Sequence, residues 1–512
     1  MAENRSSLSV MKELDGDPAV ITTESRRNVG RFTAINLVGS ALPLLVAVAT
    51  VPRYLSTFGE VRYGIWLVLW VLISYFGMFD LGLGRAIANS MAKLRAASAA
   101  ERESVLWTGV SVNLGVGIVL GALALGGSEL AMRRWSGLGP SLQPELIAAL
   151  PWLAATIPLL VVASVLIGAL EGLEHFLVIN LVGMIGSVSL QILPLAAGAA
   201  VAPRLDVLAA ATTLALMLST TLAAIACFIY LPLTTRPRFD GRRAVALFQF
   251  GAWITVTSLI SPLMSTLDKL IIGAVSGARA VTYYTVPFNL VTRLWILPAA
   301  LARSVFPSFS YLAEADARRL ANESSRALSA VMTPITVIAI LAVDTFMRAW
   351  VGPTFAMAAA LPAEILLLGL WVNSLAFVPY TFLQAQGRPD LPAKLHLVEL
   401  FPFLGILWLG IKFGGVAGAA VAWSARVFFD TVFLMIAAKN PPRSQAYLAP
   451  AAFLLFVAFA LAQVTSVSLV DRALMCSALG GAALTWSWFV APPSLRHHAL
   501  RFRPRLRPAS TR

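Results

Sequence analysis

Long apolar segments alternate with short polar stretches through most of the chain. Each segment is about 17–25 residues long, the length that an α-helix needs to cross a hydrocarbon core of about 30 Å. The fourteen segments cover approximately residues 31–51, 63–84, 105–126, 147–169, 177–200, 207–231, 246–272, 282–307, 327–347, 361–383, 394–411, 416–437, 447–464 and 472–491. The pattern therefore predicts an all-α polytopic membrane protein with about 14 transmembrane helices.

The positive charges follow the same alternation. The net charge of the chain is +14. Its Lys and Arg residues gather in every second polar stretch and at the two ends of the chain. Such an asymmetry is typical of loops that stay in the cytoplasm, and it does not indicate nucleic-acid binding. It predicts that both termini are cytoplasmic, with Arg62 outside and Arg85 inside.

Composition excludes the soluble classes of protein. Hydrophobic residues make up 58% of the 512 residues and charged residues only 12%, against about 25% charge in soluble domains. No Walker motif, His-Glu-x-x-His zinc motif or paired-Cys site occurs, and the loops are too short for a catalytic domain. We therefore expect no enzymatic activity, no metal and no cofactor.

The chain also repeats itself. Gly172 ends the fourth segment as Gly387 ends the tenth, and the turn around Tyr63 corresponds to a turn around Tyr283. Two halves of six spans are parallel repeats, which can enclose a cleft that opens to either side. The expected regions are a cytoplasmic segment at 1–30, a six-helix bundle at 31–231, a basic linker at 232–245, a second bundle at 246–437, two extra helices at 438–491 and a basic tail at 492–512.

Ionisable residues inside the segments are the candidate functional groups. A charge in the bilayer centre costs about 2.5–3.5 kcal/mol on insertion scales, so it marks a partner or a wet cavity. Asn289 and Arg293 are four residues apart on one helix face, and Arg303 follows in the same segment. The spacing predicts a cavity lined by cations, and the planar fork of arginine suits phosphate.

Other polar residues have simpler interpretations. Asp80 and Arg85 are expected to form an ion pair at a helix end, and Arg426 is expected to pair with Asp430, four residues away. The two histidines beside cytoplasmic turns, His175 and His396, are expected to be solvated. Gly-x-x-x-Gly spacings predict close helix contacts at Gly117/Gly121, Gly168/Gly172 and Gly410/Gly414.

Several motifs in order resemble a known family. The first half contains Arg53-Tyr54-Leu55, Gly59, Tyr63-Gly64-Ile65-Trp66 and Asp80-Leu81-Gly82-Leu83-Gly84, and the second contains Asp268-Lys269, Gly273, Tyr283-Tyr284, Phe306-Pro307 and Gln384-Ala385-Gln386-Gly387-Arg388-Pro389-Asp390. This order resembles that of bacterial polysaccharide (O-antigen type) flippases of the multidrug/oligosaccharidyl-lipid/polysaccharide exporter superfamily. The resemblance covers roughly residues 30–490.

The resemblance implies a V-shaped, alternating-access transporter of two six-helix bundles plus two C-terminal helices in the bacterial cytoplasmic membrane. Its substrate would be an undecaprenyl-diphosphate-linked oligosaccharide, and its partners membrane lipid, a polysaccharide polymerase and glycosyltransferases. It assigns substrate binding to Arg293, Arg303, Lys269 and Asn289, with Arg31 and Arg85 at the cytoplasmic mouth. Candidates for coupling to an ion gradient are Asp80, Asp268 and Glu399.

Three alternatives remain open. A multidrug exporter of the same superfamily would favour acidic cavity residues, which the cations of the eighth segment argue against. A peptidoglycan-precursor flippase differs only in its substrate. A polyprenyl-sugar polymerase or ligase usually needs a large external loop, whereas the longest external loop here, at about 126–146, is small.

Overall fold

The computed structural model describes residues 23–77, 80, 82–94, 98–134, 142–231, 239–245, 267–439, 445–464, 469–493 and 496. For residues 23–41, 129–134 and 469 it describes the backbone alone. The helices are α2 (Thr23–Gly77), α3 (Leu83–Lys93), α4 (Ala99–Arg134), α5 (Leu142–Gly172), α6 (Phe176–Ala200), α7 (Leu205–Tyr230), α9 (Leu267–Val291), the 3-10 helix η1 (Thr292–Trp295), α10 (Ile296–Tyr311), α11 (Glu314–Val351), α12 (Pro353–Ala385), α13 (Asp390–Ala437), α14 (Leu448–Ala462) and α15 (Leu469–Val490). The described residues form no strand, which confirms the all-α prediction.

Ten helical stretches among the described residues are long and apolar enough to cross a membrane. Three of them contain a glycine with non-helical backbone angles: Gly59 in α2, Gly277 in α9 and Gly415 in α13. The multi-pass membrane architecture is therefore confirmed, whereas the number of about 14 separate spans stays a prediction.

The reversal inside α2 shows how one assigned helix serves as two. Gly59 has φ 74° and ψ 165°, a conformation open essentially to glycine alone. The rings of Tyr54 and Tyr63 stack across it with centroids 5.4 Å apart, whereas nine residues of unbroken helix would separate them by about 13 Å. The two arms of α2 therefore fold back beside each other.

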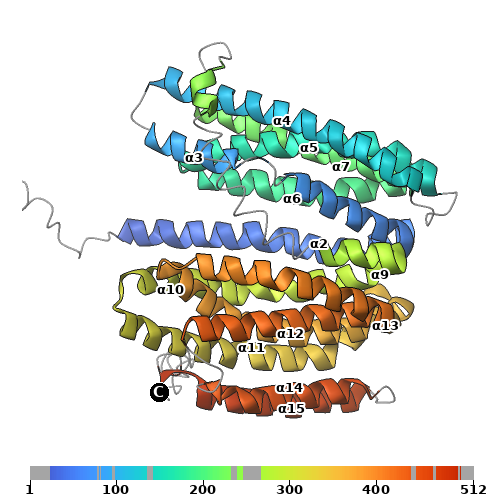
Figure 1. Cartoon of the computed structure of the whole chain (residues 1–512), viewed down its shortest axis with the longest axis vertical. Helices are drawn as coiled ribbons and strands as arrows, with labels where there is room; N and C mark the ends of the chain where they lie inside the picture. The colour runs from blue at the N-terminus through green and yellow to red at the C-terminus, as the bar shows by residue number, and fades with distance from the viewer. Residues whose placement is uncertain are drawn as a thin grey trace, which may run out of the picture.

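The helices gather into two groups (Figure 1). Helices α3 to α7 pack on one another, and helices α9 to α13 form the second group. Helix α2 contacts α6 on one side and α9 on the other, and α14 and α15 pack on α11. The residue boundaries given above for the two bundles stay a prediction.

Glycines permit the closest helix contacts. A Cβ atom on Gly168 would lie 2.2 Å from the carbonyl oxygen of Gly84, and one on Gly172 would lie 2.4 Å from that of Ala88. These contacts hold α3 against α5. The contacts predicted from the Gly-x-x-x-Gly spacings are confirmed for this pair and for Gly117/Gly121. In the third pair Gly410 meets Gly418 of the returning arm of α13, whereas nothing lies within 4 Å of Gly414.

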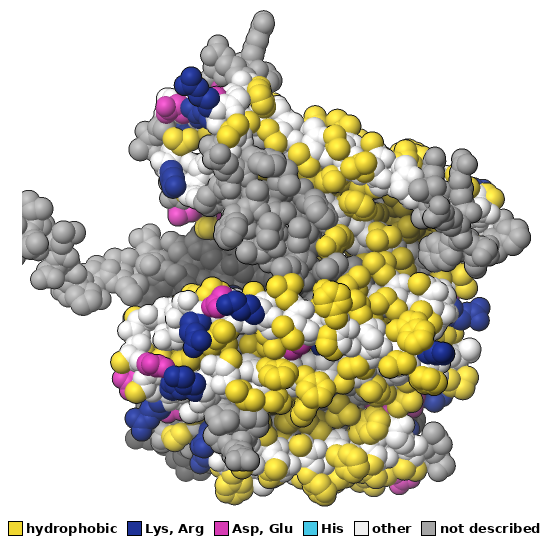
Figure 2. Space-filling view, viewed as in Figure 1, with side chains coloured by type: hydrophobic (Ala, Val, Ile, Leu, Met, Phe, Trp, Pro, Cys, Tyr) yellow, Lys and Arg dark blue, Asp and Glu magenta, His cyan; other side chains and the backbone are white. Residues whose placement is uncertain are grey.

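The surface agrees with a membrane setting. Figure 2 shows a broad hydrophobic face over the middle of the molecule, with Lys and Arg side chains gathered toward its ends. Large apolar side chains such as Phe401, Phe413 and Phe489 are more than two-thirds exposed. Exposed apolar area of this extent is typical of a lipid-facing surface and not of a soluble monomer.

Candidate functional site: a cavity with one cationic wall

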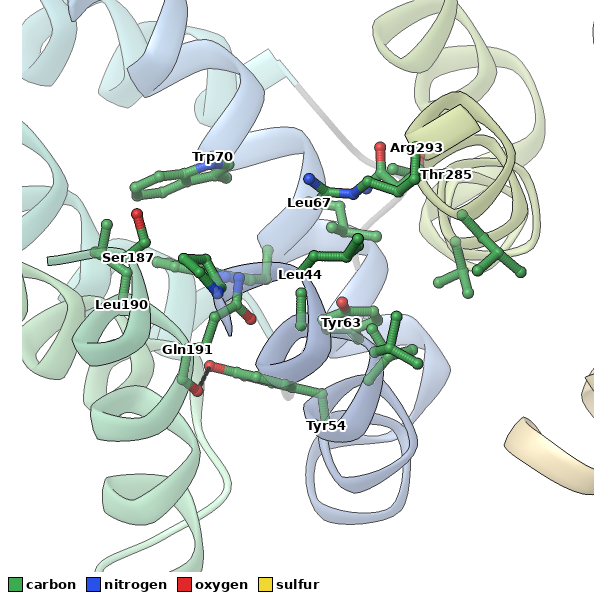
Figure 3. Close-up of a pocket in the computed structure, with 18 of the residues that line it drawn as sticks. Leu44, Tyr54, Tyr63, Leu67, Trp70, Ser187, Leu190, Gln191, Thr285 and Arg293 are labelled. Atoms are coloured by element: carbon green, nitrogen blue, oxygen red, sulfur yellow. Dashed lines mark hydrogen bonds between the residues drawn. The ribbon is translucent and has the colours of Figure 1, made fainter. Parts of the chain in front are cut away.

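A cavity of about 530 Å³ lies between the two groups of helices. Both arms of α2, helix α6, helix α9 with η1, and single residues of α7 and α11 line it (Figure 3). Its described lining residues are Pro43, Leu44, Ala47, Val48, Val51, Tyr54, Tyr63, Trp66, Leu67, Trp70, Val71, Ser187, Leu190, Gln191, Thr212, Lys269, Thr285, Val286, Asn289, Leu290, Arg293 and Trp350. The volume falls in the usual range for a small-molecule site.

The wall formed by α9 and η1 is cationic. It contributes Lys269, Asn289 and Arg293, three of the six residues predicted to bind substrate. Arg293 lies where the helix tightens into the 3-10 geometry of η1, and its guanidinium projects into the cavity (Figure 3). No Asp or Glu is among the described lining residues. The described part of the cavity is therefore suited to an anion.

Lys269 is held beside a buried carboxylate. Its ammonium lies 4.9 Å from the centre of the Phe288 ring. Asp268 is fully buried behind it and accepts hydrogen bonds from the Tyr284 hydroxyl at 2.9 Å and the Lys269 backbone N–H at 2.7 Å. Asp268 itself does not line the cavity. These hydrogen bonds hold the Asp268 side chain in the protein interior.

The described residues of the opposite wall are uncharged, and several of them are aromatic. Trp66 and Trp70 of α2 lie with ring centres 6.2 Å apart, and Trp70 faces the cavity across from Arg293 (Figure 3). On α6, the Gln191 carbonyl accepts a hydrogen bond from Tyr54 at 2.9 Å, and its side-chain oxygen accepts one from Thr50 at 3.3 Å. The sequence analysis missed this wall, although Gln191 is an amide inside a predicted apolar segment.

The remaining predicted substrate residues lie elsewhere. Arg303 is exposed on α10 and does not line the cavity. Arg85 is exposed on α3. The side chain of Arg31 is not among those that the structure describes. Asp80 forms the turn before α3: its Oδ1 atom accepts a 2.8 Å hydrogen bond from the Gly82 N–H, and its carbonyl accepts one from the Leu83 N–H. These bonds shape the turn into α3, and a role of Asp80 in ion coupling stays a prediction.

Glu60 joins the two halves at the end that carries the Gly59 reversal. Its carbonyl accepts a hydrogen bond from the Thr282 hydroxyl at 2.7 Å. Its carboxylate accepts one from Tyr283 at 2.7 Å and lies 3.3 Å from Arg279 Nε. All three partners follow the second reversal, at Gly277. We call these contacts the Glu60 latch, and they join α2 to α9.

The two reversals that meet at the latch have nearly identical backbones. Gly277 has φ 82° and ψ 173°, close to the angles of Gly59. A Cβ atom on Gly64 would lie 1.8 Å from the carbonyl oxygen of Ala278, so the segments touch backbone to backbone. This geometry supports the repeat proposed from the turns around Tyr63 and Tyr283.

A second polar cluster lies within α13, and it corrects the expectation for His396. His396 is not a solvated loop residue: its side chain is 18% exposed, and Nε2 lies 3.4 Å from Asp430 Oδ1. The Arg426 guanidinium lies 5.3 Å from the centre of the Phe403 ring. Glu399, a candidate for ion coupling, is buried in the same cluster. In the described part of the chain, no three His, Cys, Asp or Glu side chains are grouped to hold a metal ion.

Long apolar helices in two packed groups, with a cavity between them, define a multi-pass membrane transporter. Residues 62–360 match the family described as "Polysaccharide biosynthesis protein", and the chain belongs to that family. This confirms the predicted family, and the transporters and flippases among the matched proteins confirm the prediction of a transporter and not an enzyme.

Two curated relatives are similar in sequence. The chain is 28% identical over 403 residues to a "Putative O-antigen transporter" of Shigella flexneri, covering 78% of this chain and 95% of the relative. It is 22% identical over 203 residues to the "Lipopolysaccharide biosynthesis protein WzxC" of Escherichia coli strain K12, covering 39% of this chain and 41% of the relative.

Solved structures share the fold. The lipid II flippase MurJ in an inward closed conformation has a TM-score of 0.67 at 14% identity, covering 92% of this chain and 99% of MurJ. An inward-facing MATE family multidrug transporter of the MOP superfamily has a TM-score of 0.66 at 13% identity. The match covers 84% of this chain and 100% of the transporter chain. An outward-facing MATE transporter scores 0.56 at 15% identity, covering 88% and 96%.

Proposed function

We propose that this protein moves an undecaprenyl-diphosphate-linked oligosaccharide from the cytoplasmic to the outer leaflet of the bacterial cytoplasmic membrane. The observation that carries the proposal is the wall of Lys269, Asn289 and Arg293 in a cavity whose described lining has no carboxylate. The family match and the relative named as an O-antigen transporter support the same substrate class.

The chemistry divides the substrate between the two walls. Arg293 can donate two parallel hydrogen bonds to a phosphate, and Lys269 adds a compact positive charge. The diphosphate therefore belongs on the α9 wall. Trp70 and Gln191 offer an apolar ring face and an amide to a sugar, which carries both C–H and O–H groups. The polyprenyl tail stays in the surrounding lipid.

The Glu60 latch, which joins the two halves at one end, fits a transporter that takes up its substrate from the other end. In the orientation predicted from the Lys and Arg distribution, both termini are cytoplasmic and the Glu60 latch is on the outer side. The TM-score of 0.66 with an inward-facing MATE transporter, against 0.56 with an outward-facing one, supports this state. The glycosyltransferases that build the oligosaccharide and the polymerase that uses it are the partners this reaction requires.

Other substrates fit the cavity less well. A cationic drug would meet Lys269 and Arg293 and find no carboxylate among the described lining residues. A peptidoglycan precursor also carries a diphosphate, so the sugar wall must discriminate between the two lipid-linked substrates. Competition between them for binding to the purified protein measures this preference directly.

The test is export in a strain that lacks the chromosomal gene. An Arg293→Ala variant is expected to leave lipid-linked sugar in the inner leaflet and to abolish surface polysaccharide, while the protein stays in the membrane. Arg303→Ala is the matched control, since it removes the same charge from an exposed position outside the cavity. Normal export by the Arg293→Ala, Arg303→Ala double variant would refute a cationic substrate site.

A further inference from the structure

A second, smaller pocket lies at the end of the second group of helices that is opposite to the reversals at Gly277 and Gly415. Helix α11 begins at this end, α12 and α13 end there, and α14 begins there. The pocket has a volume of about 70 Å³ and shares no described lining residue with the central cavity. One molecule of liquid water takes up about 30 Å³. The pocket therefore has room for a small polar group and none for an oligosaccharide.

One side of this pocket is polar and comes mainly from α11. Arg318, Asn322 and Ser325 follow one another at spacings of four and three residues, so they lie on one face of the helix. Lys439, just after the end of α13, completes this side. The Arg318 guanidinium also contacts Glu314, which occupies only part of its five N–H donors. No Asp or Glu is among the described lining residues, so the pocket offers two cations to an anion.

The backbone of Lys439 has an unusual conformation for a lysine. Its φ angle is 57°, in the left-handed region, and it directly follows the C-cap of α13 at Ala438. Glycine or asparagine usually occupies this position, because a branch-free or short polar residue tolerates such angles better. The chain therefore places a cation beside the pocket where an uncharged residue fits the backbone at least as well.

Gln445 is the observation that points most directly to a ligand. It lines the pocket, is only 5% exposed, and its Oε1 atom accepts no hydrogen bond from a described residue. The segment is held against α11, where the Arg326 guanidinium lies 5.3 Å from the centre of the Tyr447 ring. A buried acceptor without a partner is costly and rare in folded proteins. Gln445 therefore favours a ligand that carries a hydrogen-bond donor.

The floor of the pocket is apolar. Helices α12 and α13 contribute side chains such as Val378, Phe382 and Met435. An inorganic anion gains nothing from such a surface, whereas the carbon atoms of an organic phosphate ester lose contact with water against it. Two cations, an acceptor that needs a donor and an apolar floor together describe a small ester that is anionic, hydroxylated and partly apolar.

We infer that this pocket binds a phosphate ester that carries a hydroxyl group, as in the glycerophosphate headgroup of an anionic membrane lipid. The phosphate contacts Arg318 and Lys439, and the hydroxyl group donates to Gln445. A lipid is the favoured source because the pocket lies at the ends of helices that are long enough to cross a membrane, where headgroups gather. In the predicted orientation these headgroups belong to the cytoplasmic leaflet. The inference does not rest on the proposed function, because no described residue of the central cavity takes part.

Native mass spectrometry of the full-length protein tests the need for a hydroxyl group. Phosphatidylglycerol and phosphatidylmethanol carry the same charge, but only phosphatidylglycerol has hydroxyl groups beside its phosphate. An Arg293→Ala background removes the arginine of the central cavity from the titration. Phosphatidylglycerol should bind about three- to tenfold more tightly than phosphatidylmethanol. Gln445→Met keeps the length of the side chain and should abolish this preference. Equal binding of both lipids before that substitution, or an unchanged preference after it, would overturn the proposal and assign Gln445 Oε1 to water.

A second variant separates lipid binding from folding. Lys439→Asn removes the cation and keeps a residue that tolerates the left-handed backbone, so the lipid-free protein should unfold at the same temperature or a higher one. Phosphatidylglycerol should bind about three- to fivefold more weakly. Lys394→Gln is the control, since it removes an exposed cation of α13 outside the pocket, paired with Asp390, and it should leave the affinity unchanged. A lower unfolding temperature with unchanged affinity in Lys439→Asn would contradict the proposal.

Soluble glycerol 3-phosphate distinguishes the two possible sources of the ligand. It carries the same phosphate and hydroxyl groups but has no acyl chains. At a concentration equal to that of phosphatidylglycerol it should displace almost none of the bound lipid. Displacement of half of the lipid or more would overturn a membrane lipid as the ligand and would identify a soluble phosphate ester in its place.

Discussion

The two walls of the central cavity come from corresponding places in the two halves, yet among the described lining residues only one wall carries charged side chains. Trp66 and Tyr284 lie at the same distance after their reversal glycines, as do Trp70 and Phe288. Aromatic rings therefore occupy matching positions in both halves, but Trp66 and Trp70 line the cavity whereas Tyr284 and Phe288 are buried behind the other wall. The second half departs from this plan one turn later, where the chain tightens into η1 and presents Arg293.

The difference teaches that the two halves share the arrangement of their helices, and that residues present in only one half give the cavity its charge. Two identical aromatic walls would offer a symmetric slot for an apolar or neutral ligand. Placing Lys269 and Arg293 on one wall gives the ligand a charged end and a neutral end. A diphosphate joined to sugars has the same polarity, and the following experiments separate its two ends.

The largest effect should follow reversal of charge on the α9 wall. A Lys269→Glu, Arg293→Glu variant loses two charge-assisted interactions, each worth about 1.5–3 kcal/mol, and adds repulsion. Binding of undecaprenyl diphosphate should fall at least about 100-fold, as measured by titration of the protein in nanodiscs. Arg303→Glu, outside the cavity, should bind within about threefold of the unmodified protein. Retained affinity in the double variant would show that the walls are not functionally distinct.

The next effect concerns the contact that holds the walls together at one end. Glu60→Gln removes the carboxylate that forms an ion pair with Arg279 and accepts a hydrogen bond from Tyr283. Losing about 1.5–3 kcal/mol of charge-assisted bonding should shift the balance toward opening of this end by about tenfold or more. Spin labels at Val201 and Phe413, both exposed at this end, should report a longer separation by pulsed electron resonance in a variant whose native cysteines are replaced.

The matched control for the Glu60 latch is Asp206→Asn. Asp206 also pairs with an arginine at this end of the molecule, at 3.0 Å, but its partner Arg204 belongs to the same half. The label distance should therefore stay unchanged. An equal lengthening in both variants would show that the change reflects general loosening and not an opening of the latch.

The sequence predicted the helices and their membrane setting better than it predicted which residues form the candidate site. Apolar periodicity sufficed for the helices because every backbone polar group in a bilayer must be satisfied within them. The polar face of Asn289 and Arg293 was predictable since a charge in an apolar run needs a wet cavity. Which cations share a cavity depends on packing between distant helices, so Arg303 could not be told from Arg293 by spacing alone.

The same limit explains the cluster in α13. His396 and Asp430 are far apart along the chain, and only the reversal at Gly415 places their side chains together. Local spacing favoured a pair of Arg426 with Asp430, because four residues make one helical turn. In the structure the Arg426 guanidinium lies over Phe403 and Asp430 has a histidine neighbour from the other arm, while the pair of Arg426 with Asp430 stays a prediction.

A smaller effect is expected on the neutral wall. Trp70→Ala should weaken binding of the oligosaccharide-linked lipid by about three- to tenfold, because the ring face is lost to the sugar. Binding of undecaprenyl diphosphate without sugar should be unchanged, since it engages the opposite wall. Trp70→Phe keeps a ring and should restore most of the affinity. Equal losses for both lipids would contradict a division of the substrate between the walls.

The smallest effect should come from Arg85, which was predicted to lie at the cytoplasmic mouth and which is exposed on α3, away from the cavity. An exposed cation attracts an anion over about 10 Å at moderate ionic strength but contributes little to the bound state. Arg85→Ala should therefore slow association of the diphosphate lipid by about two- to threefold at low salt and leave dissociation unchanged. Stopped-flow binding at rising salt measures both rates, and the difference should vanish as screening increases. A faster dissociation or a loss that persists in high salt would instead place Arg85 in contact with bound substrate, and the cationic wall would then extend beyond α9.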